Sequence, residues 1–147
     1  MKKLILLVFV LGIFLDVSAQ QMKVVTIVES IVPMGLGRSR IIENTSSIDA
    51  ANFTTVRTDG KKSKQNDVKG SKAKVDSFSE TKLLNFYSAV GINFQNIASN
   101  DALITSKINE LIKKGWSLTF VTSAVESVGG KDDKNGIFIT RLYFSKK

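Results

Sequence analysis

The sequence predicts an α+β domain: an antiparallel sheet of about five strands with one main helix packed on one face, plus a long polar basic insertion loop. Three observations predict this class. Several runs are rich in β-branched or aromatic residues, which favour strands. A single run has the clear period of an amphipathic helix. The 147 residues include no cysteine, so the fold depends on its hydrophobic core without disulfides.

Residues 1–19 have the pattern of a secretory signal peptide. A basic start at Lys2 and Lys3 is followed by an apolar run over 4–15, and Val17-Ser18-Ala19 supplies small or β-branched residues before the expected cleavage. The run of 12 residues is shorter than the roughly 20 that cross a bilayer, so we expect no transmembrane anchor. The sequence therefore predicts a secreted or periplasmic protein whose single domain spans 20–147.

Extended segments are expected at both ends of this domain. The run 23–32 carries β-branched residues on both faces, and the Pro and Gly residues of 33–37 predict a turn into a second strand over 38–43. Near the C-terminus, 116–125 and 137–144 alternate or cluster apolar residues and predict a closing pair of strands.

The segment 44–77 is polar and predicts a mobile insertion. Gly60 and Gly70 break any regular pattern, and large apolar residues are few. From Arg57 to Lys74 there are seven lysines and arginines against two aspartates, a net charge of +5. Most of the +7 that remains after removal of the signal peptide therefore lies in one loop.

The clearest helix is predicted over 100–114. Asn100 is a suitable N-cap, Ile104, Ile108, Leu111 and Ile112 form one apolar stripe, and Gly115 suits the position after the helix. The segment 82–90 fits both a helix and a strand, and we expect a strand on the grounds of the family resemblance that follows. Trp116 is expected to fold over the stripe, which makes Ile108, Leu111, Gly115 and Trp116 a predicted structural core.

The run I-N-E-L-I-K-K-G-W-S-L at 108–118 resembles a group of small bacterial domains of unknown function. The signature of this group is a helix ending in N-E-L-x-x-x-G-W-E-L, preceded by a strand and followed by a strand pair. The resemblance covers roughly 82–147. Within it, the segments 91–101 and 138–144 are similar to a secreted subfamily of this group. It implies a compact α+β fold and no defined chemistry. Ser117 stands where the group usually has Glu, so a role tied to that Glu does not transfer.

The composition excludes several catalytic chemistries. Without histidine or cysteine there is no Ser–His pair, no thiolate nucleophile and no zinc-finger ligand set. The string 131–136 departs from a calcium loop because Lys131 replaces the first aspartate. The glutamates show no paired spacing. We therefore expect no enzyme, no metal and no cofactor.

Arg38 and Arg40 are the candidate anion-binding residues. They follow Gly35 and Gly37, and in a strand they share one face while Ser39 points away. Glu29 lies among Val and Ile, where an edge or solvent-facing position is expected, and Arg141 is a candidate structural partner for Glu29 or for Glu126.

These observations predict an exported, non-enzymatic binding or structural module of the bacterial cell envelope. The alternatives are a periplasmic inhibitor or stress factor acting through a loop and, third, a small hydrolase. Expected partners are an envelope protein or an anionic polymer. Nucleic acid is not expected, because the protein is exported and its basic loop lacks the aromatics that stack on bases. Exposed strand edges make a homodimer an open alternative.

Cleavage near Ala19 is directly testable. Mass spectrometry of the protein recovered from its producing cell should show a chain that begins near Gln20. An intact Met1 on a cytosolic form would contradict export.

Overall fold

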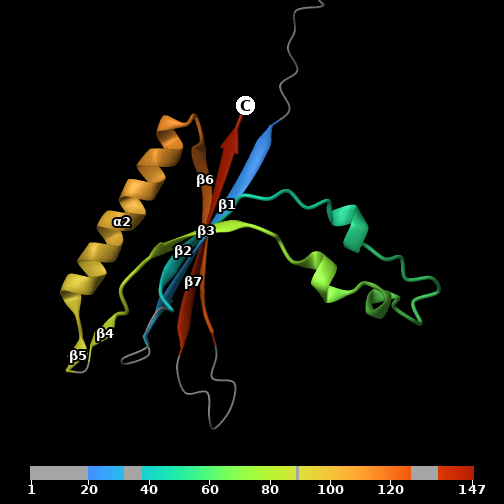
Figure 1. The fold of residues 1–147 in the computed structure, drawn as a ribbon, viewed down its shortest axis with the longest axis horizontal. Coiled ribbons are helices and arrows are strands. Elements are labelled where there is room, and N and C mark those ends of the chain that lie inside the picture. Colours follow the sequence, from blue (N-terminus) through green and yellow to red (C-terminus); the bar gives the residue numbers. More distant parts are fainter. Residues whose placement is uncertain (1–19, 32–37, 89, 127–135) are drawn as a thin grey trace, which may run out of the picture.

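The computed structural model describes residues 20–31, 38–88, 90–126 and 136–147. They form a five-stranded antiparallel sheet with one long helix against one face (Figure 1), which is the predicted α+β class. The sheet comprises β1 (Gln21–Ser30), β2 (Arg40–Asn44), β3 (Phe78–Lys82), β6 (Ser117–Val125) and β7 (Ile137–Lys146), and a small pair is formed by β4 (Tyr87–Ser88) and β5 (Gly91–Ile92). The helix is α2 (Phe94–Lys113). The predicted signal peptide, the predicted turn at 33–37 and positions 131–135 of the string compared with a calcium loop lie outside the described residues.

The strand order is β3-β2-β1-β7-β6, so the N-terminal and C-terminal strands pair at the centre of the sheet. Ten residues of β1 match ten of β7, from Gln21 opposite Lys146 to Ser30 opposite Ile137. The short β2 and β3 extend one side and β6 closes the other. The β-branched residues of β1 explain its central place, because they pack well on a pleated surface with neighbours on both edges.

The core lies between α2 and the middle of the sheet. Its buried members are Val25, Ile27, Ile41, Leu83, Leu111, Leu142 and Phe144. Ile104, Ile108 and Trp116 pack against this cluster and remain partly exposed. Among the described residues, this core includes nothing from β6.

The end of α2 turns sharply back toward the sheet. Gly115 has a φ of 83°, the left-handed region in which a side chain would be strained. The N–H of Trp116 donates to the carbonyl of Leu111 at 3.1 Å, and the Nζ of Lys23 lies 5.3 Å from the centre of the indole ring. The turn therefore sets Trp116 against the core, with the Lys23 cation over its ring.

The predicted start of the helix is wrong. The helix begins at Phe94, and its N-cap is Asn93, whose side chain accepts from the N–H of Asn96 at 3.1 Å. Asn100 is instead fully buried inside α2. Among the described residues, no helix combines the length and the apolar character needed to cross a membrane.

The strand expected over 82–90 is misplaced. The third strand, β3, precedes it at 78–82, and 83–86 is irregular before the two-residue β4. The physical reason is that backbone groups of this segment bond outside a ladder. The N–H of Leu83 donates to Ser39 O at 3.0 Å, and the N–H of Phe86 donates to Ser30 O at 3.1 Å.

Asn100 ties this irregular segment to α2. Its side chain accepts from the N–H of Leu84 and donates to the carbonyl of Leu84, both at 2.8 Å. One amide thus replaces the pairing that a neighbouring strand would give the backbone. Asn100 is fully buried, so removal of its side-chain amide would leave the N–H and C=O of Leu84 without these partners.

The insertion occupies residues 45–77, between strands that pair with each other. Asn44 ends β2 opposite Phe78, which starts β3. Serines close the base: Ser46 Oγ donates to Ser77 O at 3.1 Å and accepts from Ser77 N–H at 3.2 Å. Three single 3-10 turns follow, at Ala50–Phe53, Gln65–Asp67 and Gly70–Ala73. The segment extends from the sheet on the side opposite α2 (Figure 1); its mobility stays a prediction.

Replacing Asn100 by alanine should destabilise the fold by about 2–5 kcal/mol, because the N–H and C=O of Leu84 would both be left unsatisfied. Urea unfolding followed by circular dichroism measures this loss. Asn109→Ala on the exposed side of the same helix is the control and should change stability by less than about 0.5 kcal/mol. Equal effects of the two variants would contradict the role assigned to Asn100.

Candidate functional site

Among the described residues, no helix covers the face of the sheet opposite α2, and we call it the open face. Residues paired across strands share a face and alternate with the buried positions, which assigns the following residues to it. They include Met22, Val24, Thr26, Val28, Arg40, Ile42, Phe78, Glu80, Lys82, Phe120, Thr122, Ala124, Ile137, Ile139, Arg141 and Tyr143. Apolar side chains alternate here with a few charged ones, and Met22, Phe78 and Phe120 are about half or more exposed. Exposed apolar side chains gathered on one face of a sheet are typical of an interaction site.

The two predicted anion-binding arginines come together at one side of the open face. Arg38 and Arg40 line a shallow hollow with Val28, Ile42, Phe78, Glu80 and Ile137. Ser39 points the other way, as expected: it is buried, accepts from the N–H of Ser30 at 3.0 Å and donates to Asn85 Oδ1 at 2.7 Å. The guanidinium of Arg40 forms an ion pair with Glu80. This pairing reduces the positive charge that Arg40 can offer an anion.

Arg141 lies near the middle of the open face. It is exposed and stands between Thr26 of β1 and Thr122 of β6. The predicted pairing of Arg141 with Glu29 is wrong, because Glu29 lies opposite Phe138, on the helix-facing side of the sheet. No ion pair of Arg141 with Glu126 is present among the described residues.

The insertion presents the largest concentration of cations. Its seven lysines and arginines are all exposed, and none forms an ion pair with another described residue. These residues are Arg57, Lys61, Lys62, Lys64, Lys69, Lys72 and Lys74. A hydrogen bond from Gln65 Nε2 to Thr55 Oγ1 at 2.7 Å links the outgoing and returning parts of the segment. The arrangement is a charged arm attached beside an apolar surface.

The glutamates of the helix-facing side have structural partners. Glu43 accepts from Lys23 at 2.5 Å and from Lys107 at 2.8 Å, which ties β1, β2 and α2 together. Burial raises the pKa of Glu43, but the hydrogen bonds from Lys107 and Lys23 outweigh it and the pKa is lowered. Hydrogen bonding to Glu43 raises the pKa of Lys107. This cluster holds the helix on the sheet.

Among the described carboxylates, Glu29 alone shows a raised pKa. The prediction that it faces solvent or an edge is wrong, because it lies on the central strand β1 and is partly buried beneath α2. Burial raises its pKa, the hydrogen bond from Asn100 Nδ2 at 3.2 Å lowers it, and the charge of Asp101 raises it. Among the described residues there is no group of three or more acidic side chains that could hold a metal.

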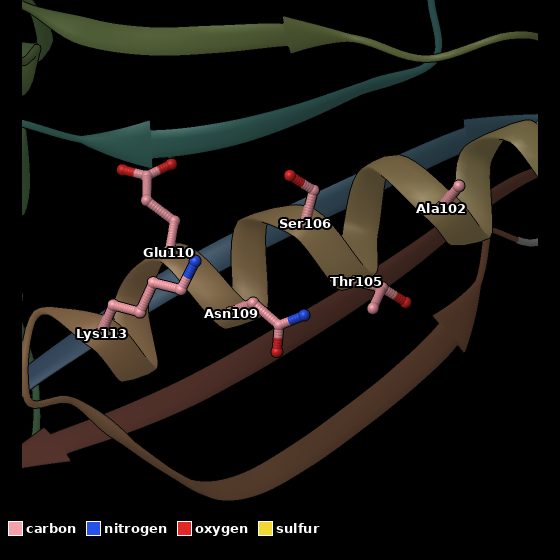
Figure 2. Close-up of a pocket in the computed structure, with 6 residues that line it drawn as sticks. All are labelled: Ala102, Thr105, Ser106, Asn109, Glu110 and Lys113. Carbon is pink, nitrogen blue, oxygen red and sulfur yellow. The ribbon is translucent and has the colours of Figure 1, made fainter.

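A second hollow follows α2 itself. Its lining side chains are Ala102, Thr105, Ser106, Asn109, Glu110 and Lys113. Figure 2 shows them spread along the helix without converging on one point, with Thr105 and Asn109 on the flank toward β6 and Glu110 on the opposite flank. Glu110 is already paired with Lys107 and Lys114, which lowers its pKa. All six residues belong to α2, so the hollow is a shallow depression on the surface of the helix and has no convergent polar site.

Comparisons of the chain with protein-family models, with curated proteins and with solved structures find no match. The resemblance at 108–118 therefore stays a prediction.

Reasoning from the sequence misses the open face and the role of Asn100. The open face had a signal, since β1 carries apolar residues on both sides while the chain predicts one helix to cover them. Asn100 had none, because its partners are backbone atoms of a segment without regular structure.

Replacing Glu29 by glutamine should stabilise the protein at pH 7. A carboxyl whose pKa is raised by folding adds to the stability of the folded state most fully below its unfolded pKa, and this added stability is lost as the pH rises through the folded pKa. At pH 7 the ionised Glu29 is therefore less favourable in the folded state than a neutral glutamine. The gain is expected to stay below about 1 kcal/mol, because Glu29 is only partly buried and glutamine keeps the bond from Asn100.

Urea unfolding at pH 7 and at about pH 3 tests this, because both forms are neutral at the lower pH and the difference should vanish. Glu126→Gln, an exposed site at the end of β6, is the control. A difference in the free energy of unfolding between wild type and E29Q that persists unchanged at pH 3 would contradict the raised pKa of Glu29.

Proposed function

We propose that the protein is an exported, non-enzymatic binding module of the cell envelope that holds an anionic polymer on its basic insertion. The observation that carries the proposal is the concentration of unpaired cations on 45–77, outside the folded core. Seven exposed cations on one projecting segment attract a polyanion through summed Coulomb interactions, whereas cations spread over a surface attract it less.

The placement of the insertion supports this role. Its ends meet at the paired residues Asn44 and Phe78, so a polymer bound there adds no strain to the sheet. Arg38 and Arg40 line a hollow on the open face together with Phe78, the residue that follows the insertion. These arginines extend the positive region from the insertion onto the sheet. A non-enzymatic role is supported by the state of the glutamates, since Glu29, Glu43, Glu80 and Glu110 are engaged by side chains of the fold.

The leading test is a charge reversal on the insertion. Lys61→Glu, Lys62→Glu and Lys64→Glu together should weaken binding to dextran sulfate by at least about tenfold, and should reduce the slope of log K against log salt. Titration calorimetry at several salt concentrations measures both quantities, with uncharged dextran as the blank.

A matched control changes the same number of lysines elsewhere. Lys113→Glu, Lys114→Glu and Lys147→Glu are at exposed positions and give the same net charge as the insertion variant. This control should keep affinity within about threefold of wild type, since screening weakens charges that lie far from the bound polymer. Equal losses in the two triple variants would show attraction to net charge alone and would contradict the proposal.

A further inference from the structure

The two edges of the sheet differ in how they are protected. β3 has five residues, includes Glu80 and Lys82, and is joined directly to the insertion. Shortness, charge and a neighbouring loop are the usual devices that prevent an edge strand from pairing with another chain. β6 has nine residues, S-L-T-F-V-T-S-A-V, with no charge and no proline. Within the part of the chain that the structure describes, its only such device is a bulge between Leu118 and Phe120.

β6 also exposes apolar side chains on both of its faces. Val121 and Val125 are 47% and 57% exposed on the side of α2, and Phe120 is 63% exposed on the open face. No residue of β6 is buried. Helix α2 leaves this strand uncovered, and its flank toward β6 presents the small, uncharged Thr105 and Asn109 (Figure 2).

We propose that β6 pairs antiparallel with β6 of a second copy, giving a symmetric dimer with one continuous ten-stranded sheet. The twofold axis passes Thr122, so each face of one sheet continues into the same face of its partner. In this register Phe120 lies opposite Ala124 of the partner subunit, and Val121 lies opposite Ser123 of the partner subunit. Each large side chain therefore meets a small one, which makes the strand complementary to itself.

Charge favours a second copy as the occupant. Two molecules that each carry about +7 repel each other, so contact through an uncharged surface is favoured, and β6 contains no charged residue. The nearest cation on the open face is Arg141, directly across from Thr122. Two such arginines would stand three strand spacings apart, roughly 14 Å, which exceeds the Debye length of about 8 Å at physiological salt.

The first test compares two exposed valines. Val121→Lys places like charges beside the twofold axis, whereas Val24→Lys, 41% exposed in the wild type, makes the same change on the open face. Sedimentation velocity from about 1 to about 200 μM should show a wild-type monomer–dimer equilibrium, a monomeric V121K and an unchanged V24K. A wild type that stays monomeric, a dimeric V121K, or a dimer broken by V24K would overturn the proposal.

The second test gives a positive signal even if V121K fails to fold. The chain has no cysteine, so Thr122→Cys introduces a single thiol directly at the axis. Mild oxidation should give a disulfide-linked dimer rapidly for T122C. Ala124→Cys lies on the same face of the same strand but about 13 Å from its own copy, and should cross-link at least tenfold more slowly. No cross-link at Thr122, or equal rates at both positions, would overturn the proposal.

Discussion

A single helix cannot cover a five-stranded sheet, and most features of this protein follow from that limit. A helix is about 10 Å wide with its side chains, whereas five strands at about 4.8 Å spacing span roughly twice that width. Helix α2 therefore covers the centre of one face, where Val25, Leu142 and Phe144 are buried. The opposite face and the outer strand β6 remain available to other molecules.

Polar contacts, rather than additional apolar surface, position the helix at this central place. Glu43 receives Lys23 from the sheet and Lys107 from α2, and Asn100 binds the backbone of Leu84 from the buried side of the helix. The burial of a small apolar core differs little in free energy between neighbouring placements of the helix on the sheet. Directional hydrogen bonds and ion pairs therefore have a large effect on which placement is adopted. This explains why a fully buried asparagine occurs in the middle of an apolar stripe.

The sequence predicts the architecture well, and the places where prediction fails share a physical cause. The class, the central strands and the end of the helix at Gly115 follow from local pattern alone. The helix start does not, because Asn93 and Asn100 are both good caps; the apolar stripe, which continues back to Ile97, was the available signal.

The segment 83–86 and the burial of Glu29 depend on contacts with residues far away in the chain, which local patterns do not encode. Arg38 and Arg40 are brought to one hollow, but the ion pair between Arg40 and Glu80 depends on a strand 40 positions later.

Because Ser46 and Ser77 hold the two ends of the insertion together, the stability of the sheet depends little on the length of the insertion. Because the two ends already meet at Asn44 and Phe78, the sheet needs only a closed loop between them. Loop-closure entropy grows slowly, so 33 residues cost only about 2 kcal/mol more than a four-residue turn. The segment can therefore be lengthened, shortened or rewritten at little thermodynamic cost while the sheet and the helix are retained.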